Sequence, residues 1–169
     1  MVMTIKEYIT DEMERLDKTG KYKFIGYNCK YGSKMYGTLE KVRPESIIET
    51  PVNEGMMVGM GIGLALKGWK VMVMFERHDF LLANGGLDQI VNHVDKMFFD
   101  LPIGIRCIVG ATEPLHPGNQ HSQNYSTALK SMCSKIQVYD SALTGYFYPT
   151  QEFARIFIEY KEDYEQEMV

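Results

Sequence analysis

The sequence predicts an α/β fold of three layers, in which a mostly parallel sheet is covered by helices on both faces. Strand-like and helix-like segments alternate along almost the whole chain, which is typical of such a sheet. The segment KVMVMF at 70–75 is apolar throughout, as expected of a strand buried on both faces. The chain has 169 residues, and domains usually have ~100–200. We therefore treat 1–169 as a single domain.

The predicted helices have apolar residues three or four positions apart, so that these residues share one helix face. The first helix has the clearest ends, because Thr4 and Glu7 are placed as a capping box and Gly20 follows the last turn. Asn53 is placed to cap the second helix. The apolar stripe of the last helix is Phe153, Ile156, Phe157 and Tyr160. In chain order, the predicted helices cover 5–19, 54–66, 86–99, 124–133 and 151–166.

The predicted strands are short runs rich in apolar and β-branched residues. The segment 28–37 after the first strand is too rich in Gly, Lys and Tyr to continue it, so we expect a loop there. Ligands of such a sheet bind beyond the carboxyl ends of the strands, so functional residues are expected in the loops that follow strands. In chain order, the predicted strands cover 23–27, 46–49, 70–75, 103–109 and 136–139.

Composition argues against two classes of partner. The chain has 18 Lys and Arg against 22 Asp and Glu, a net charge of −4, and no basic stripe, so nucleic acid is not expected to bind. The longest mostly apolar segment, 55–66, is too short to span ~30 Å of hydrocarbon, and the N-terminus is charged where a secretory signal is apolar. The cysteines form no Cys-x-x-Cys pair, which suits a reducing compartment. We expect a cytoplasmic protein without a membrane segment.

The glycines at 59, 61 and 63 invite comparison with the dinucleotide-binding motif Gly-x-Gly-x-x-Gly. Leu64 and Leu66 break its register, and the glycines lie inside a predicted helix and not at its start. We expect them to allow close packing of this helix against a neighbour, such as a second subunit. A Rossmann-like nucleotide-binding protein is therefore disfavoured, and the sequence contains no Walker phosphate loop.

Histidines and cysteines give no metal motif. The histidines form neither His-Glu-x-x-His nor a Cys/His quartet, so no metal site is expected. No cysteine lies at a predicted helix start or beside a base, so packing thiols are favoured over a Cys–His nucleophilic pair. These residues are His78, His93, His116 and His121, with Cys29, Cys107 and Cys133.

Glu54 has the most suggestive setting of the carboxylates, because it lies in the first turn of an apolar helix that directly follows a strand. Met56 and Met57 come next, so the carboxylate borders an apolar pocket in which its hydrogen bonding and pKa can be tuned for proton transfer. The structural alternative is a negative charge that stabilises the helix start. The residues by themselves favour neither interpretation.

Five motifs follow one another along the chain: Glu49-Thr-Pro-Val-Asn-Glu54-Gly, the helix of small residues after it, Phe75 to Phe80, Asp88-Gln-Ile-Val-Asn92 and Gln120-His-Ser-Gln123. In this order and near-spacing they resemble the pyrimidine-binding domain of the transketolase-like, thiamine diphosphate-dependent enzymes. The resemblance extends from about residue 4 to about residue 143 and is closest to the beta subunits of 2-oxoacid dehydrogenases of the pyruvate dehydrogenase type. It implies the thiamine diphosphate-binding fold.

The resemblance implies roles for five residues. Glu54 matches the Glu that hydrogen-bonds the aminopyrimidine ring, so that the ring's own imino group takes the C2 proton. Phe80 matches the aromatic residue on the pyrimidine, and Val52 an apolar residue of the same pocket. His121 matches a histidine that faces the substrate, the alternative being a loop histidine bonded to backbone. Glu76 falls where the family has an apolar cofactor contact, which leaves its role open.

The resemblance also implies a partner. The family binds the diphosphate and Mg²⁺ through a Gly-Asp-Gly motif in another domain, and these 169 residues contain none. We therefore expect an alpha-like subunit that carries Gly-Asp-Gly, holds Mg²⁺ and shares thiamine diphosphate with this chain in a two-plus-two heterotetramer. The family's C-terminal transketolase-type domain is also not expected here.

The implied function is that of the pyrimidine-binding subunit of a split enzyme. Such an enzyme cleaves a carbon–carbon bond next to a carbonyl and transfers the acyl or two-carbon ketol fragment of a 2-oxo acid or ketose. A 2-oxoacid dehydrogenase component proper is one alternative. Glu76-Arg77-His78 and two extra residues between Phe80 and Asp88 argue against an ordinary pyruvate dehydrogenase component. The other alternative is a non-catalytic interaction module that retains the fold.

Overall fold

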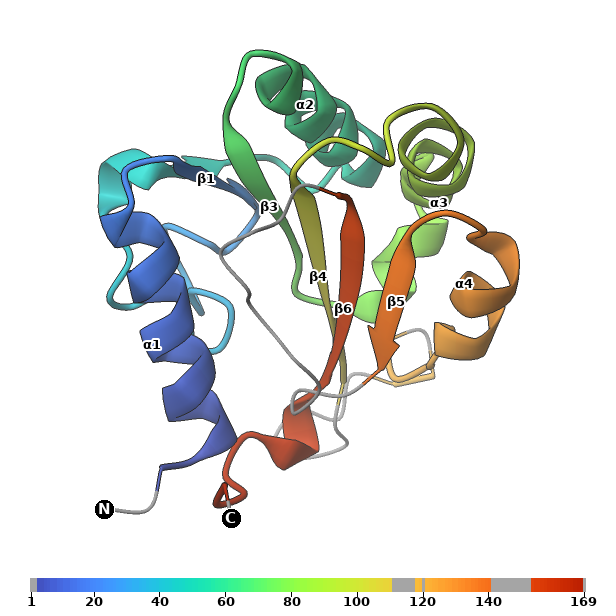
Figure 1. The fold of residues 1–169 in the computed structure, drawn as a ribbon. Helices are drawn as coiled ribbons and strands as arrows, with labels where there is room; N and C mark the ends of the chain where they lie inside the picture. Colours follow the sequence, from blue (N-terminus) through green and yellow to red (C-terminus); the bar gives the residue numbers. More distant parts are fainter. Residues whose placement is uncertain (1–2, 111–117, 120, 141–152, 169) are drawn as a thin grey trace.

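A computed structural model describes residues 3–110, 118–119, 121–140 and 153–168. It has a six-stranded sheet in the order β2-β1-β3-β4-β6-β5, and every pair of neighbouring strands is parallel (Figure 1). The predicted fold class is confirmed. The strands are β1 Tyr22–Gly26, β2 Ile47–Glu49, β3 Lys70–Phe75, β4 Ile103–Val109, β5 Gln137–Asp140 and β6 Arg155–Tyr160.

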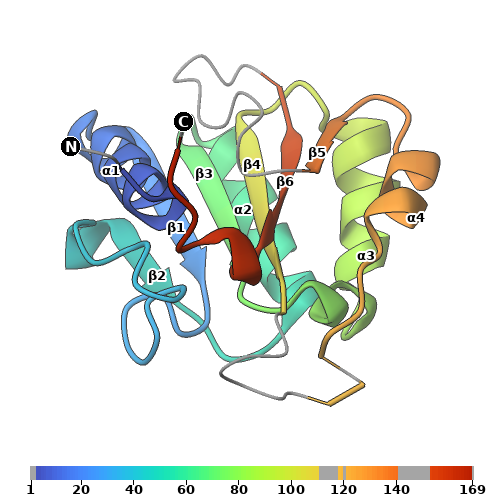
Figure 2. The same ribbon diagram turned by 90° about the horizontal axis from the view of Figure 1, so that it is seen from below.

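Helices form a layer on each face of the sheet. Figures 1 and 2 show α1 on one side and α2, α3 and α4 on the other. The strands alternate accordingly: Val71 and Val73 of β3 pack in the core under α2, whereas Met72 and Met74 pack in the core under α1. The helices are α1 Ile5–Lys18, α2 Glu54–Leu66, α3 Gly86–Asp88 with a π-helical continuation over Gln89–Asp95, and α4 Ser126–Met132. Short 3-10 turns cover Pro44–Ser46, His78–Leu82 and Lys161–Asp163.

Both predicted helix caps are confirmed. Thr4 Oγ1 accepts a hydrogen bond from the backbone N–H of Glu7 at 3.2 Å, and the Glu7 carboxylate accepts one from the Thr4 N–H at 2.8 Å. Asn53 Oδ1 accepts from the Met56 N–H at 2.9 Å. The chain ends that are described also meet, because the Met168 N–H donates to the Met3 carbonyl at 2.8 Å (Figure 1).

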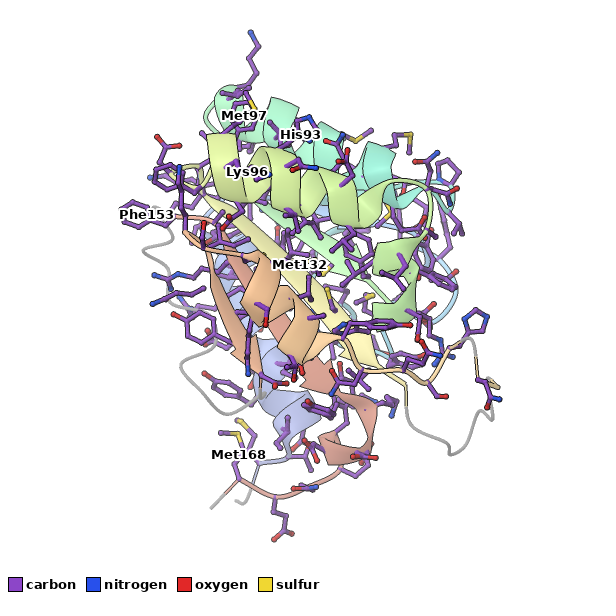
Figure 3. All side chains as sticks on the ribbon, turned by 90° about the vertical axis from the view of Figure 1, so that its right-hand side faces the viewer. His93, Lys96, Met97, Met132, Phe153 and Met168 are labelled. Carbon is purple, nitrogen blue, oxygen red and sulfur yellow. The ribbon has the colours of Figure 1, made fainter. Side chains whose placement is uncertain are left out.

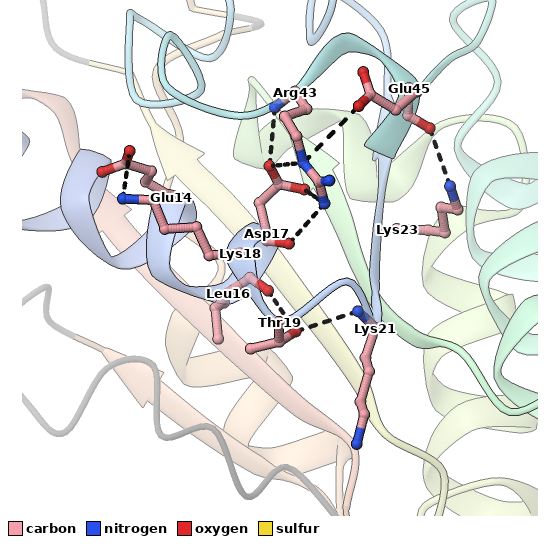
Figure 4. Close-up of polar contacts among 9 residues, drawn as sticks. All are labelled: Glu14, Leu16, Asp17, Lys18, Thr19, Lys21, Lys23, Arg43 and Glu45. Carbon is pink, nitrogen blue, oxygen red and sulfur yellow. Dashed lines mark hydrogen bonds and ion pairs between the residues drawn. The ribbon is translucent and has the colours of Figure 1, made fainter.

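The end of α1 is held by an ion pair (Figure 4). Arg43 Nε donates to Asp17 Oδ2 at 2.8 Å, and the Arg43 backbone N–H donates to the same oxygen at 3.1 Å. Burial acts to raise the pKa of Asp17, but hydrogen bonds from Arg43 and Ser46 outweigh burial and leave this pKa below its usual value. Asp17 therefore fastens α1 to the segment that leads into β2.

The helix predicted over 151–166 is wrong. Residues 151–152 lie outside the described chain, and Arg155–Tyr160 is strand β6, which pairs with β4 on one side and β5 on the other. Ile156 and Ile158 face the α2 core, while Phe157 and Glu159 are buried on the α1 face. A short apolar run is compatible with both the helical period of about 3.6 residues and the strand period of about 2. The helical interpretation did not include Ile158 or Glu159 among the buried residues. Phe153, which that interpretation buried, is exposed (Figure 3).

The helix predicted over 86–99 is confirmed in position but differs in its winding. Its middle, Gln89–Asp95, is a π-helix. Ile90 and Val94 are fully buried against the core, and their spacing of four places both residues inward in either kind of helix. Apolar spacing therefore could not reveal the wider winding.

The glycines of α2 differ in what surrounds them. A Cβ at Gly61 would lie 2.9 Å from Val73 Cγ2, so glycine is needed for the close approach of α2 to β3. At Gly59 the nearest atom would be 3.9 Å away, and Gly63 has no neighbour within 4 Å among the described residues. Among these three glycines, close packing within the described part of the chain therefore explains only Gly61.

Arg106 and Glu159 form a buried ion pair between β4 and β6. Both side chains are 0% exposed, and Arg106 Nε and Nη2 donate to the two carboxylate oxygens at 2.5 and 2.8 Å. Arg106 Nη2 also donates to Thr38 Oγ1 at 3.2 Å, and the Tyr164 hydroxyl donates to Glu159 Oε2 at 2.5 Å. The pair thus has hydrogen-bond partners on both of its members.

Glu159→Leu should lower the free energy of unfolding by about 3–5 kcal/mol, because it leaves the Arg106 charge buried alone. The double variant Arg106→Met with Glu159→Leu removes that charge, so it should lose less stability than Glu159→Leu. Urea unfolding followed by circular dichroism measures both. A Glu159→Leu variant with the parent's unfolding midpoint would contradict the assignment.

Candidate functional site

The residues expected to act lie at the carboxyl edge of the sheet. Val52 and Glu54 follow β2, Glu76 and Phe80 follow β3, and His121 follows β4 after the undescribed residues 111–117 and 120. His116 and Gln120, which belonged to the sequence patterns, thus lie outside the described chain. In a parallel sheet this is the edge where ligands bind.

Glu54 is a buried carboxylate with one unsatisfied oxygen. It is the first residue of α2 and is 0% exposed. Asn84 Nδ2 donates to Oε2 at 2.9 Å, whereas Oε1 is buried without a hydrogen-bond partner among the described residues. A buried acceptor without a donor costs about 1–3 kcal/mol, so Oε1 is poised for a donor from outside the chain.

A tight turn brings Asn84 to Glu54. Asn84 and Gly85 have φ of +47° and +77°, in the left-handed region. A Cβ at Gly55 would lie 2.5 Å from the Asn84 carbonyl oxygen, and one at Gly86 would lie 2.8 Å from Glu54 Cβ. Glycine at 55 and 86 therefore permits this approach. The turn falls in the stretch that is two residues longer than the beta-subunit pattern.

Phe80 and His121 are brought together. Their ring centroids are 5.0 Å apart at an interplanar angle of 81°, and the other neighbour of Phe80 is Tyr27 at 5.8 Å. His121 Nδ1 is buried and has no partner among the described residues. Phe80 and His121 also line a cavity of about 340 Å³, which is completed by Asp79, Leu82, Ala83, Gln123 and Tyr125.

Val52 and Glu54 are not among the residues that line this cavity. The Val52 side chain is on the surface, with 55% of the residue exposed. The described chain therefore presents two neighbouring parts of a site. One is the free oxygen of Glu54, and the other is the cavity beside Phe80 and His121.

Glu76 holds the loop that follows β1. Its carboxylate accepts hydrogen bonds from Asn28 Nδ2 at 2.8 Å and from the Ser33 hydroxyl. Glu49 accepts from three backbone N–H groups of the same loop, at 2.6–3.0 Å. Both Glu76 oxygens are thus engaged within the chain, and a cofactor contact by Glu76 stays a prediction.

Tyr27 is a member of the site that sequence reasoning missed. Its hydroxyl is buried without a hydrogen-bond partner among the described residues. Burial raises the pKa of Tyr27, and the carboxylates of Glu76 and Glu54 raise it further. Tyr27 is therefore a neutral phenol that contacts the Phe80 ring and interacts electrostatically with the Glu76 and Glu54 carboxylates. Nothing in the KFIGY run distinguishes this tyrosine from a core residue.

Three further residues were also missed. Asn84 contacts Glu54, while Asp79 and His78 contact the segment that carries His121. The sequence signal was that His78 and Asn84 lie in the two stretches that depart from the beta-subunit pattern, whereas Asp79 lies in neither.

The other chemistries weighed from the sequence find little support. Burial raises the pKa of the Cys29 and Cys107 thiols and raises that of Cys133 to about 11, so these cysteines are packing groups and not activated nucleophiles. Within the described residues, no three His, Cys, Asp or Glu side chains are placed to hold a metal ion. No helix in that part of the chain is both long and apolar enough to cross a bilayer.

Comparison with known proteins identifies relatives in one group of enzymes. No protein-family model matches the sequence. It is 28% identical over 135 residues to the pyruvate dehydrogenase E1 component subunit beta of Rickettsia bellii, which covers 75% of this chain and 41% of that protein. It is 30% identical over 142 residues to the mitochondrial pyruvate dehydrogenase E1 component subunit beta of Saccharomyces cerevisiae. That alignment covers 73% of this chain and 36% of the yeast protein. The chain thus spans less than half the length of these relatives.

Solved structures share the fold. A split-gene transketolase in an inactive beta4 tetramer superposes with a TM-score of 0.68 at 15% identity, over 93% of this chain and 50% of that one. Transketolase from Campylobacter jejuni superposes with a TM-score of 0.70 at 9% identity, over 99% of this chain and 26% of the transketolase chain. The resemblance predicted from the motifs is therefore confirmed.

We expect His78 to make the stability of the fold dependent on pH. Burial lowers the pKa of His78 from 6.5 to about 4, against a smaller opposing effect of Asp140. The unfolded chain therefore binds more protons between these values, and the free energy of unfolding should fall as the pH is lowered from about 6.5 to about 4. The shift corresponds to about 3 kcal/mol.

In His78→Gln this part of the pH dependence should be absent, because glutamine does not titrate. Urea unfolding of the two proteins at pH 7 and at pH 5 measures it. Equal losses of stability in both proteins would show that His78 does not carry the effect.

Proposed function

We propose that this chain, which resembles pyruvate dehydrogenase E1 beta subunits in sequence and transketolase in fold, is the pyrimidine-binding subunit of a split thiamine diphosphate-dependent enzyme. One observation carries the proposal. Glu54 lies buried at the carboxyl edge of the sheet with Oε1 free of any described partner. A buried, unsatisfied acceptor at the start of an apolar helix fits a ring N–H donor supplied by a cofactor.

The residues present fit this cofactor. Glu54 would accept a hydrogen bond from the aminopyrimidine at Oε1, while Asn84 keeps Oε2 in place. Phe80 would pack on the ring and Val52 would cover it from the exposed side. Thiamine diphosphate, when bound, supplies an electron sink for cleaving a bond next to a carbonyl.

His121 would serve the substrate. It lines the cavity beside Phe80, and its Nδ1 is unpaired in the described chain. An imidazole with a free ring nitrogen in an open surface pocket can give or take a proton, or stabilise charge that develops on a carbonyl oxygen. Within the described residues Nδ1 has no hydrogen-bond partner, which leaves this nitrogen available for that role.

A partner subunit would complete the site. We place the diphosphate and Mg²⁺ on an alpha-like chain with Gly-Asp-Gly, in a two-plus-two heterotetramer, because these 169 residues lack that motif. The relatives are beta subunits, and one structural neighbour is a split-gene transketolase. That neighbour's beta4 tetramer is described as inactive, which agrees with a beta chain that needs a partner.

The reaction would be transfer of an acyl or two-carbon ketol fragment from a 2-oxo acid or ketose. The alternative, a 2-oxoacid dehydrogenase component proper, is favoured by the sequence relatives, whereas the split-gene neighbour favours ketol transfer. The turn at Asn84 and the Glu76-Arg77-His78 stretch lie beside the cavity and depart from the beta-subunit pattern, which suggests a different substrate. We place the enzyme in the cytoplasm, although the yeast relative is mitochondrial.

Calorimetric titration of thiamine diphosphate with Mg²⁺ tests the shared site. Binding is expected for the assembled complex with a Gly-Asp-Gly partner and not for either chain alone, because the diphosphate contacts belong to the partner. Micromolar affinity of the isolated chain would overturn the split-site proposal. An assembled complex that binds nothing would favour the non-catalytic module.

Glu54→Gln should abolish turnover by the complex and leave assembly intact. The glutamine amide keeps the size of the side chain but removes the carboxylate at Oε1. Steady-state kinetics and gel filtration of the complex measure the two effects. Val58→Ala, on the buried side of the same helix, is the control for general damage to α2. Normal turnover by Glu54→Gln would refute the assignment.

A further inference from the structure

Three consecutive residues of the 3-10 turn His78–Leu82 all meet the segment that carries His121. The Phe80 ring contacts the His121 ring at 5.0 Å between centroids. Asp79 Oδ1 accepts from the backbone N–H of Gln123 at 2.9 Å, and His78 Nε2 accepts from the backbone N–H of Tyr125 at 3.2 Å. The turn that carries Phe80 therefore also fixes the loop that carries His121.

We propose that Asp79 and His78 are positioning residues, which hold the 121–125 loop so that the His121 ring stays in contact with the Phe80 ring beside the cavity that both line. This inference rests on the proposed function, in which His121 acts on the substrate. Both residues lie within the Phe75 to Phe80 motif, but the resemblance implies a role for neither of them.

Burial makes both contacts specific. Asp79 is 8% exposed and His78 is 0% exposed, so water does not readily replace either acceptor. With Nε2 accepting a hydrogen bond, the neutral imidazole of His78 carries its proton on Nδ1. The two loop residues that are held, Gln123 and Tyr125, are two positions apart, and both donate their backbone N–H to the same 3-10 turn.

The loop is confined from two further directions. Asn124 Nδ2 donates to the Tyr160 hydroxyl at the end of β6, at 2.8 Å. A Cβ at Gly110 would lie 2.6 Å from the His121 carbonyl oxygen, so the loop runs directly against the end of β4. The loop that carries His121 is thus held by residues that follow β3 and β4 and by the last residue of β6.

The two anchors differ in what a conservative substitution preserves. Asp79→Asn retains an oxygen that can accept from Gln123, whereas Asp79→Ala removes it. His78→Gln can place an acceptor near the Nε2 position, whereas His78→Leu fills the volume without one. Each alanine or leucine variant therefore has a matched partner that separates the hydrogen bond from general packing.

Hydrogen–deuterium exchange of the assembled complex tests the anchoring without reference to activity. Asp79→Ala and His78→Leu should speed exchange of the 121–125 loop amides by about ten-fold or more, while peptides from β3 and β4 exchange as in the parent. Asp79→Asn and His78→Gln should restore most of the protection. Unchanged loop exchange in Asp79→Ala would overturn the proposal.

A double-mutant cycle tests whether Asp79 acts through His121. Asp79→Ala should lower kcat by about 10- to 100-fold, because a small displacement of a reacting group is costly. In a His121→Ala background the same change should lower kcat less than about two-fold. Equal losses in both backgrounds would show a structural role independent of His121 and would refute the inference.

The cycle and the exchange data separate this inference from the proposed function. If His121→Ala has full activity, the catalytic role of His121 fails, yet loop exchange still reports whether Asp79 and His78 hold it. If His121→Ala is inactive and Asp79→Ala changes neither exchange nor kcat, the positioning role fails and the proposed function survives.

Discussion

The buried ion pair between Arg106 and Glu159 is the interaction on which the rest of the arrangement depends. It joins β4 to β6 on the α1 face, where both side chains are fully buried. A buried charge without a partner is strongly destabilising. Separating β4 from β6 would leave Arg106 or Glu159 in that condition, so the pair favours the order in which these strands are neighbours. Thr38 and Tyr164 supply the remaining hydrogen bonds and tie two distant segments to the pair.

The geometry of the candidate site depends on β6 lying beside β4. With β6 placed beside β4, Tyr160 at its end accepts from Asn124 and donates to Asp140 of β5 at 2.6 Å. The loop with His121 is therefore held by a strand residue 36 positions beyond Asn124 in the chain, as well as by hydrogen bonds to near neighbours such as Gly118. The turn after β3 completes the arrangement through Asp79 and His78.

Several carboxylates in this chain hold loops by accepting hydrogen bonds from backbone N–H groups. Glu49 accepts from three backbone N–H groups after β1, and Asp95 accepts from the backbone N–H groups of Ser134, Lys135 and Ile136. Glu76 joins Glu49 on the same loop. Glu54 differs from all of these, because one of its oxygens is buried and unmet within the described chain. Asp79 shares this feature at Oδ2, so what distinguishes Glu54 is the combination of a free buried oxygen with a place at the start of the apolar helix α2.

The sequence by itself determined the alternation of elements, the caps at Thr4 and Asn53, and the motif residues Glu54, Phe80 and His121. These follow from local rules, since caps and buried parallel strands leave short, specific patterns. Only the tertiary structure decided that Arg155–Tyr160 is a central strand, because the run fits two periods and its partners β4 and β5 are distant in sequence. It also decided the neighbours of Tyr27, Asp79 and Asn84, since contacts between loops depend on the strand order and leave no periodic trace in the chain.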